Sequence, residues 1–401
     1  MIFQDPSKKS TSLMSQSSVD ELSREEIARY SRHLTLPEVG IEGQKKLKAA
    51  SVLCIGTGGL GSPLLMYLAA AGVGKLGIVD YDFVDKSNLQ RQIIHSDDTV
   101  GMKKTLSAKK RIISLNPNCQ VELYHEILTS QNALEIIKPY DIVCDGTDNF
   151  PTRYLVNDAC VMLGKPNIYG SVFRFEGQAS VFNLFDNSPN YRDLVPEPPP
   201  PGAVPSCAEG GVMGIVPGII GLIQATETIK IITGIGQTLD RRLLIFDSIK
   251  MKFREMALRP DLSIPKINQL IDYKEFCGLS KDSSIDEEAG TVDTISAFDL
   301  QELLDDLSEK ICIIDVRSEQ EYTLVHLKDS ILIPLYTIES GESIERVREL
   351  ARENKLVCHC KLGGRSAKAI IALQKFGISA YNLAGGIDAW AKDIDQSMIR
   401  Y

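Results

Sequence analysis

The sequence predicts an α/β protein with a doubly wound parallel sheet and a second, smaller α/β domain. From Ser51 onward, short β-branched runs alternate with amphipathic helical stretches, which is the pattern of parallel strands joined by helices. The chain has 401 residues, more than one ordinary core contains, so two domains are expected. A polar, acidic stretch, SKDSSIDEEAG at 280–290, precedes a second β/α series that begins at Thr294.

These observations set the expected boundaries of the domains. The first twenty residues are polar and lack the apolar core of a secretory signal, so we expect a disordered tail. The expected parts of the chain are this tail at 1–20, a first domain at 21–260, a linker at 261–290 and a second domain at 291–401.

Composition excludes several classes of function. The formal net charge of −9 and the absence of a long Lys/Arg run argue against nucleic-acid binding. The longest apolar stretch, 212–225, is too short to span a bilayer and contains Pro217, so it predicts a buried helix and no membrane partner. Nine unevenly spaced cysteines without a secretory signal indicate reduced thiols in a cytoplasmic protein.

The first domain is expected to alternate strands with helices until its last third. The strands are predicted at 51–56, 75–80, 121–126 and 141–146, and the helices at 60–72, 103–115 and 211–232. The proline-rich run PEPPPPGAVP at 196–205 can be neither helix nor central strand, so a crossover loop is expected there. Residues 241–258 are expected to form two antiparallel strands that close this domain.

The second domain repeats the alternation over a shorter length. Its helices are predicted at 296–308 and 366–376, and its strands at 311–316, 355–360 and 380–385. The two halves differ in length and in motifs, so they are not copies of one repeat.

A glycine loop follows the first predicted strand. Gly56, Gly58 and Gly61 have G-x-G-x-x-G spacing between a strand and a helix, and Asp80 ends the next strand. This context is that of a Rossmann-like nucleotide-binding turn, in which a helix amino-terminus faces a phosphate. The alternative is a tight turn without ligand, and the motif does not separate NAD from ATP.

Residues farther along the chain favour a nucleoside triphosphate. Polar and charged side chains gather after the predicted strands, namely Asp80, Asp82, Asn88, Arg91, Gln92, Lys104 and Asp148. Arg and Lys neutralise phosphate oxygens and a carboxylate can hold Mg²⁺, whereas hydride transfer has no use for this set. The alternative for each residue alone is a surface salt bridge.

The stretch RYSRHLTLPEVG…CIGTGGLGSPLL…VDYDFVDKSNLQRQ closely resembles the MoeB/ThiF adenylyltransferases, and the resemblance extends from Leu22 to Leu258. It implies ATP- and Mg²⁺-dependent adenylation of the C-terminal Gly-Gly of a ubiquitin-like sulfur-carrier protein of the MoaD/ThiS type. By position, it implies that Gly58 and Gly59 line the phosphate loop and Asp80 holds the ribose. It further assigns Asn88, Arg91 and Lys104 to the phosphates, Asp148 to Mg²⁺, and Arg32 to a neighbouring subunit's site, so a homodimer is implied.

Cys207, in PSCAEGG, follows the proline-rich run. The resemblance implies that this thiol takes the acyl group or joins a covalent intermediate with the carrier. A thiol before a helix amino-terminus could have a lowered pKa, which suits that role. The alternative is a small residue at a loop-to-helix junction.

The sequence departs from the family at its zinc site. Many members bind structural zinc with two C-x-x-C pairs, but here Asn190-Tyr191-Arg192-Asp193 stands in place of the first pair and none follows FREMALRP. Only Cys277 remains nearby, and a structural zinc site needs four ligands. We therefore expect no structural zinc.

The C-terminal motif VCHCKLGGRS could be a redox pair, half of a metal site, a phosphatase loop or a sulfur carrier. With IIDVRSEQEY and LAGGIDAW, it resembles a rhodanese domain from Thr291 onward, apart from Val325 and Asp329 where rhodaneses have glycine. In that resemblance Cys360 carries a persulfide, and the backbone N–H groups of a loop surround it. The loop residues are Lys361, Leu362, Gly363, Gly364 and Arg365.

Physical arguments agree with a sulfur-carrying Cys360. The following helix presents its positive end to the thiolate, and Arg365 could add positive charge. Only four residues separate Cys360 from Arg365, a shorter loop than the one that phosphatases use for phosphate. Cys358 and Cys360 sit in C-x-C on a strand with Cα atoms about 6–7 Å apart, so a disulfide is unfavourable. We expect Cys358, His359 and Trp390 to be packing residues.

The two halves together predict one pathway. The first domain would activate the carrier's terminal glycine, and Cys360, loaded by a persulfide donor such as a cysteine desulfurase, would convert it to a thiocarboxylate. Whether the sulfur serves molybdenum cofactor, thiamine or tRNA thiolation stays open. Two alternatives remain, namely a non-catalytic scaffold for ubiquitin-like partners and a nucleotide-dependent redox enzyme with a thiol domain.

Overall fold

A computed structural model of the chain describes residues 21–200, 210–261, 263–278, 292–306 and 308–401. The chain divides into two compact units, Met1–Ser280 and Lys281–Tyr401, each with its own sheet. The α/β class predicted from the alternation of strands and helices is confirmed in both units.

The first unit is built on an eight-stranded sheet in the order β3-β2-β1-β4-β5-β6-β7-β8. The first five of these strands are mutually parallel, and β5 to β8 pair antiparallel. The strands are β1 Ser51–Ile55, β2 Lys75–Val79, β3 Gln120–Tyr124, β4 Ile142–Asp145, β5 Asn167–Phe173, β6 Glu176–Phe182, β7 Arg242–Asp247 and β8 Lys252–Ala257. The predicted strands at 51–56, 75–80, 121–126 and 141–146 correspond to β1, β2, β3 and β4.

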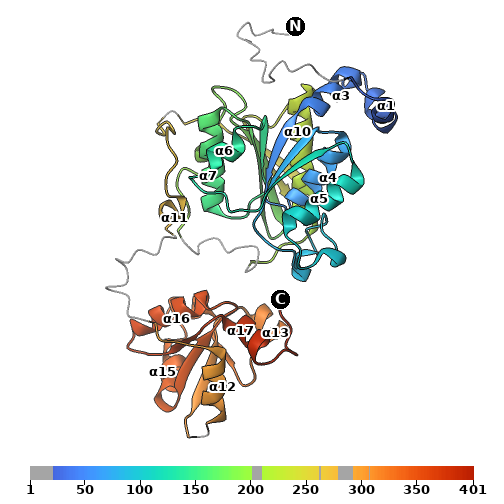
Figure 1. The fold of residues 1–401 in the computed structure, drawn as a ribbon. Helices are drawn as coiled ribbons and strands as arrows, with labels where there is room; N and C mark the ends of the chain where they lie inside the picture. Colours follow the sequence, from blue (N-terminus) through green and yellow to red (C-terminus); the bar gives the residue numbers. More distant parts are fainter. Residues whose placement is uncertain (1–20, 201–209, 262, 279–291, 307) are drawn as a thin grey trace. The chain divides into compact units, whose positions relative to one another are not determined.

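Helices cover both faces of this sheet, so it is doubly wound (Figure 1). One face carries α3 Gly40–Ala49, α4 Gly61–Ala71, α5 Lys104–Leu115 and α10 Ile215–Thr233. The other carries α6 Ala133–Ile137, α7 Phe150–Leu163, α8 Tyr191–Leu194 and α11 Tyr273–Phe276. The remaining helical segments are α1 Arg24–Arg29, α2 Ser31–Leu34 and the short 3₁₀ turns η1 Lys86–Asn88 and η2 Asp97–Thr99.

The register of the central strands places the carboxyl ends of β1, β2 and β4 at one edge of the sheet. Ile55 pairs with Val79 on one side and with Asp145 on the other, so β1, β2 and β4 end at the same level. Because carboxyl ends of parallel strands share one edge of a sheet, the residues after these strands gather there. This edge is where a ligand site is expected.

Helix α10 is the one helix in the described residues whose length and apolar composition would allow it to cross a membrane. Half of its most apolar window is buried, and it packs against α4, β5 and β6. The apolar run judged too short to span a bilayer therefore belongs to a longer helix, whose core-facing side chains explain its composition.

The first unit ends later than the sequence suggested. Residues assigned to the linker pack onto it, because the Tyr273 hydroxyl donates to Asp158 Oδ2 at 2.7 Å and the Ser130 hydroxyl donates to the Ile271 carbonyl at 2.6 Å. Cys277 is also buried in the core beside α7. The expected boundary at 260 is therefore corrected to the far end of α11.

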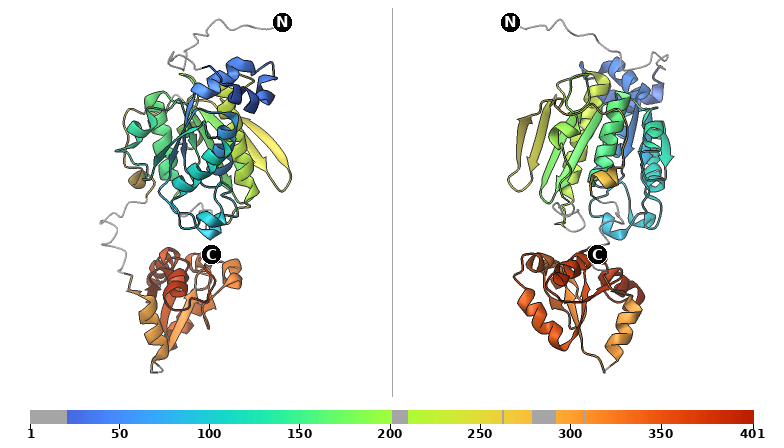
Figure 2. Two further views of the ribbon diagram at one scale, coloured as in Figure 1. Left: turned by 45° about the vertical axis from the view of Figure 1, so that its right-hand side comes forward. Right: turned by 90° about the vertical axis from the view of Figure 1, so that its left-hand side faces the viewer.

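At the other end of the sheet, β7 and β8 form a hairpin that projects at its edge (Figure 2). Every residue of β8 is exposed. The two antiparallel strands predicted within 241–258 are confirmed, and they leave one long strand edge facing outward.

The second unit has a five-stranded, all-parallel sheet in the order β11-β10-β12-β13-β9. Its strands are β9 Thr294–Ile295, β10 Ile311–Asp315, β11 Ile331–Leu332, β12 Lys355–His359 and β13 Tyr381–Leu383. Its helices are α12 Ala297–Asp305, α13 Glu319–Leu324, α14 Leu335–Glu339, α15 Ile344–Glu353, α16 Gly364–Gln374 and α17 Gly386–Asp393. Asp329, where rhodaneses have glycine, adopts the left-handed conformation with φ +60° that glycine favours.

Candidate functional site

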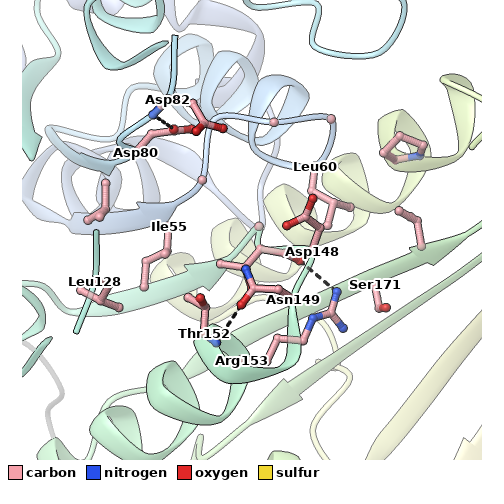
Figure 3. A pocket seen from close by; sticks show the side chains of 18 of the residues that line it. Ile55, Leu60, Asp80, Asp82, Leu128, Asp148, Asn149, Thr152, Arg153 and Ser171 are labelled. Carbon is pink, nitrogen blue, oxygen red and sulfur yellow. Dashed lines mark hydrogen bonds between the residues drawn. The ribbon is translucent and has the colours of Figure 1, made fainter. Parts of the chain in front are cut away.

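A cavity of about 370 Å³ opens where β1, β2 and β4 end (Figure 3). Most of the residues predicted from the glycine loop and the strand ends line it. They are Gly56, Gly58, Gly59, Asp80, Asp82, Arg91, Gln92, Lys104 and Asp148. The cavity therefore has the phosphate-binding composition that the sequence indicated, with apolar walls from residues such as Ile55 and Leu128.

Glycine serves a different purpose at different positions of the loop. A Cβ on Gly61 would lie 2.0 Å from the Gly56 carbonyl oxygen, so this position permits no side chain. Gly58 has nothing nearer than Gln92 Nε2 at 3.9 Å from its built Cβ, so the space beside it is open. Gly61 serves the turn, while Gly58 leaves room for a ligand to approach the backbone.

Asp80 connects the second strand to the glycine loop. Its Oδ2 accepts from the Thr57 backbone N–H at 2.8 Å and from the Thr57 hydroxyl at 2.7 Å. Its Oδ1 accepts from the Asp82 N–H at 2.9 Å. Asp80 lines the cavity as expected, and these three bonds fix its orientation before any ligand is present.

Two of the cationic side chains that line the cavity, Lys104 and Arg91, are among the predicted residues. Lys104, at the start of α5, is 6 % exposed, and its Nζ lies 2.8 Å from Asp82 Oδ2. Arg91 donates from Nη1 to the Ser87 carbonyl at 3.2 Å. Because Lys104 is buried with a single carboxylate beside it, a phosphate entering the cavity would meet a fixed cation.

Gln92 contributes a buried acceptor. Its side chain is 4 % exposed, and its Oε1 has no hydrogen-bond partner among the described residues. A buried, unpaired amide oxygen is costly unless a ligand or water satisfies it. Gln92 therefore fits a place in a ligand-binding wall.

Asp148 is exposed at the cavity and follows β4. Its carboxylate is a suitable ligand for the Mg²⁺ of a metal–nucleotide complex. Arg153, which no motif singled out, lies on α7 at the same cavity with its side chain buried. Burial alone would lower the pKa of Arg153, but Tyr169, Asp145 and Asp148 raise it, so it is a fixed positive charge.

Arg153 is held by two neutral oxygens. Its Nη2 donates to the Thr147 carbonyl at 2.9 Å and its Nη1 donates to the Tyr169 hydroxyl at 3.1 Å. The sequence contained one signal for Arg153: it lies in the first turn of the helix that follows DGTDN, and that helix starts at the cavity edge.

Three predicted residues do not line the cavity, namely Gly61, Asn88 and Arg32. Asn88 is the last residue of η1, and its Oδ1 accepts from the N–H of the N-cap residue Asp85 at 3.2 Å. Arg32 lies exposed on α2. Cys207 falls outside the described residues.

The segment that replaces the family's first cysteine pair forms α8. Arg192 makes two bonds to Asp158, from Nε to Oδ1 at 2.9 Å and from Nη2 to Oδ2 at 2.7 Å. Asp158 also accepts from the Tyr273 hydroxyl, so this carboxylate joins α7, α8 and α11. Within the part of the chain that the structure describes, no three His, Cys, Asp or Glu side chains are grouped to hold a metal.

In the second unit, Cys360 directly follows β12 and is 2 % exposed. Its Sγ accepts from the Gly363 N–H at 3.1 Å, and the Ser366 hydroxyl lies 3.5 Å from it. Helix α16 begins at Gly364, so its positive end faces the sulfur. One N–H of the predicted loop, that of Gly363, therefore donates to a buried thiol.

The loop is backed by the segment between β13 and α17. The Cys360 carbonyl accepts from Ile387 N at 2.9 Å, and the Lys361 carbonyl accepts from Asp388 N at 3.2 Å. A Cβ on Gly386 would lie 2.4 Å from the Cys360 oxygen and 2.5 Å from the Lys361 oxygen. Gly386, in LAGGIDAW, is therefore required by the close approach of the loop backbone.

Arg365, in the first turn of α16, is paired with a carboxylate. Its Nη1 and Nη2 donate to both carboxylate oxygens of Glu321. Burial opposes ionisation of Glu321, but Arg365, Ser318 and Tyr401 outweigh it and lower its pKa to about 2. The contribution of Arg365 to the field at the Cys360 sulfur stays a prediction, while the Gly363 N–H is a direct donor to Sγ.

Tyr401 completes this cluster. Its hydroxyl accepts from Arg317 Nη1 at 2.6 Å and donates to Glu321 Oε1 at 3.0 Å. The Lys361 ammonium lies 4.5 Å from the centre of its ring. The two loop cations therefore have partners on the same side of the domain.

The neighbours of Cys360 are packing residues, as expected. Cys358 is fully buried in the hydrophobic core, where burial raises the pKa of its thiol to about 12. His359 is fully buried, and burial lowers the pKa of its imidazole. Trp390 packs against the second hydrophobic cluster of this unit.

Comparison with known families and proteins agrees with this geometry. Residues 30–264 match the ThiF family, and residues 296–393 match the rhodanese-like domain. The chain is 51% identical over 386 residues to the probable adenylyltransferase/sulfurtransferase MoeZ of Mycobacterium tuberculosis, covering 95% of this chain and 96% of that protein. It is 41% identical over 409 residues to adenylyltransferase and sulfurtransferase MOCS3 of Bos taurus, covering 95% and 89%.

Solved structures agree in fold. Escherichia coli MccB covers 62% of this chain and 76% of its own with a TM-score of 0.54, at 21% sequence identity. PaaA covers 65% of this chain and 79% of its own with a TM-score of 0.52, at 22% identity.

Proposed function

The chain belongs to the ThiF family and is an enzyme that combines adenylyltransferase and sulfurtransferase activities, and from this premise we propose that it converts the C-terminal glycine of a ubiquitin-like sulfur carrier to a thiocarboxylate. The proposal covers the carrier, Mg²⁺, the persulfide donor, the roles of individual residues and a homodimeric, cytoplasmic enzyme. The observation that carries it is that one chain holds both a cavity lined by phosphate-binding residue types and a buried thiol that accepts from a backbone N–H at the start of a helix.

In the first step, a carboxylate oxygen of the carrier's last glycine attacks the α-phosphorus of ATP and pyrophosphate leaves. Arg91 and Lys104 stabilise the charge that moves toward pyrophosphate. Asp148 would hold the Mg²⁺ of the nucleotide, which would neutralise further phosphate charge. Lys104 keeps its position through Asp82, so no rearrangement of the cation is needed at that moment. Arg153 supplies a further fixed charge at the cavity wall.

In the second step, the terminal sulfur of a Cys360 persulfide attacks the acyl carbon and AMP leaves. The product is an acyl disulfide between the carrier and Cys360. A second thiol, for which Cys207 is the candidate, then attacks the Cys360 sulfur and releases the thiocarboxylate, which leaves a disulfide that an external reductant must reduce. The Gly363 N–H and the amino-terminus of α16 stabilise negative charge on the sulfur in this sequence.

An apolar surface beside the cavity suits the carrier. Phe173, at the end of β5, both lines the cavity and is exposed. Phe175 follows in the β5–β6 turn, and its carbonyl accepts from Ser248 in the β7–β8 turn. That turn and the strand after it expose Ile249 and Met251, each 70 % exposed, and Phe253. A carrier that docks on this edge would have its tail at the cavity mouth.

The remaining parts of the proposal rest on position and chemistry. Arg32 is exposed on α2 and absent from its own cavity wall, which suits an arginine that reaches a neighbouring subunit's cavity. The Asp158 cluster joins α7, α8 and α11 by ionic and aromatic contacts, so we propose a protein without structural zinc. A protein persulfide donor would load Cys360.

The full chain incubated with ATP, Mg²⁺, a persulfide donor and a carrier that ends in Gly-Gly should yield carrier with one oxygen replaced by sulfur, as read by intact-mass spectrometry. Omission of ATP should leave the carrier unchanged, and omission of the donor should stop at the adenylate. Carrier that stays unmodified in the complete mixture would contradict the proposal. Carrier binding without pyrophosphate release would indicate a scaffold, and nicotinamide binding would indicate a redox enzyme.

A further inference from the structure

His95 is buried behind the nucleotide cavity without lining it. Its side chain is 6 % exposed, and it lies in the segment that follows Arg91 and Gln92. Its backbone N–H donates to the Gln92 carbonyl at 3.1 Å. No step of the proposed chemistry uses this imidazole.

Both ring nitrogens of His95 have partners on other elements. Nε2 lies 3.2 Å from the Thr57 carbonyl oxygen, and Nδ1 lies 2.8 Å from the Ser107 hydroxyl. A carbonyl only accepts, so the proton must be on Nε2, and Nδ1 then accepts from the Ser107 hydroxyl. The contacts therefore define one neutral tautomer.

Each partner is attached to a part of the cavity. Thr57 lies between Gly56 and Gly58, and its N–H and hydroxyl hold Asp80. Ser107 lies on α5, one turn after Lys104. Three separate segments, which carry the glycine loop, the cation of α5 and the Arg91–Gln92 pair, therefore meet at one imidazole.

The charges around His95 agree with the neutral form. Lys104 on α5 and Asp80 after β2 face the imidazole, and the ammonium of Lys104 is buried. A second positive charge beside a buried ammonium is unfavourable, and protonated Nδ1 could not accept from Ser107. Burial and Lys104 together lower the pKa of His95 to about 4.

We propose that His95 is a positioning residue for nucleotide binding, which sets the spacing between the glycine loop and the cations of α5 and of the Arg91 segment. This inference rests on the proposed function of the cavity as an ATP site. His95 acts through Thr57 and Ser107 and does not touch the nucleotide.

ATP affinity of the full chain separates this role from a general effect on folding. His95→Ala should weaken ATP binding, measured by calorimetry, by about tenfold, because the glycine loop loses its link to α5. His95→Gln should recover most of the affinity, since its amide can donate to Thr57 and accept from Ser107. In ATP–pyrophosphate exchange the His95→Ala loss should fall on KM for ATP more than on kcat.

Two further variants keep the inference falsifiable. Ser107→Ala removes only the hydrogen bond to Nδ1 and should weaken ATP binding in the same direction as His95→Ala, with less effect on folding. His326→Gln, an exposed histidine of the second unit, is the matched control and should bind ATP as the unaltered chain does.

The outcomes are distinct for the two proposals. If the unaltered chain does not bind ATP, the proposed function fails. If it binds ATP and the His95→Ala and Ser107→Ala variants match it within twofold, the positioning role fails alone. A lowered melting temperature with unchanged KM for ATP would also overturn that role, because it would show His95 to be a packing residue.

Discussion

Arg365 and Glu321 form a two-pronged ion pair beside the sulfur loop, with Nη1 at 2.8 Å from Oε2 and Nη2 at 2.7 Å from Oε1. The pair joins the first turn of α16 to α13, and Tyr401 binds the same carboxylate. Because the two residues are 44 positions apart, this contact fixes the loop from outside its own motif.

Replacing Glu321 by Gln should loosen the loop, because Arg365 would keep its charge and lose its partner. We expect a loss of about 1–3 kcal/mol in the stability of the second unit and slower sulfur transfer from Cys360. Glu319→Gln, on the exposed side of the same helix, is the control. Equal transfer rates in the two variants would contradict a role for the pair.

Protonation of the Glu321 carboxylate should lower the stability of the second unit at acid pH. The folded-state pKa of Glu321 is lowered from 4.5 to about 2, so its stabilisation is complete above pH 4.5 and is lost as the pH falls toward 2. Because solvent partly screens this carboxylate, the full effect should be about 1–2 kcal/mol. Fluorescence-monitored denaturation of the chain at pH 7 and pH 3 should show part of this loss in the second unit, and Glu321→Gln should remove it.

Substitution of Cys360 and substitution of Cys358 should have different effects on sulfur transfer. Cys360→Ala should abolish thiocarboxylate formation and leave carrier-dependent ATP–pyrophosphate exchange intact, because the exchange occurs in the other unit. Cys358→Ala removes a thiol held in the core, so it should cost about 1–2 kcal/mol in stability and keep transfer. Intact-mass spectrometry of the carrier measures both, and transfer by Cys360→Ala would remove this thiol from the mechanism.

Neighbouring lysines provide a matched test of the cavity. Lys104→Ala should lower pyrophosphate exchange by a factor on the order of 100 or more, because it removes a buried cation at the phosphates. Lys103→Ala changes an exposed lysine one position earlier and should leave the exchange within twofold. A similar loss in both variants would show that α5 tolerates neither change and that the charge itself is not the cause.

The Asp158 cluster predicts a protein indifferent to chelators. Prolonged treatment with a strong zinc chelator should leave the melting temperature unchanged, and elemental analysis should find no stoichiometric zinc. Arg192→Ala should destabilise the first unit by about 3–5 kcal/mol, because it leaves Asp158 charged and almost fully buried. Zinc found at one equivalent per chain would contradict the expectation.

The sequence predicts most of this architecture because its strands are strongly patterned. Each predicted strand of the first unit is present within one or two residues, and the spacing of Gly56, Gly58 and Gly61 identifies the loop correctly. These features depend on local backbone geometry, which residue type and spacing report directly.

What the sequence did not reveal depends on contacts between distant residues. The stretch that contains Tyr273 has the composition of a linker, yet Asp158, 115 positions away, binds its hydroxyl. No motif identifies Arg153, because its position is set by hydrogen bonds to Tyr169 and Thr147. Nor does any spacing predict that Glu321 pairs with Arg365. Such partners are selected by tertiary packing, and spacing along the chain does not encode them.

The tight seat of the Cys360 loop against Gly386 bears on protein engineering. The motif CKLGGRS is a contiguous heptapeptide, which invites grafting onto another strand–helix turn. Two of its carbonyls are bonded by residues 387 and 388, however, and a methyl group at position 386 would push it outward. A transplanted heptapeptide would therefore lack the backbone hydrogen bonds that hold the Cys360 and Lys361 carbonyls in place. A working graft must include the 384–388 segment as well.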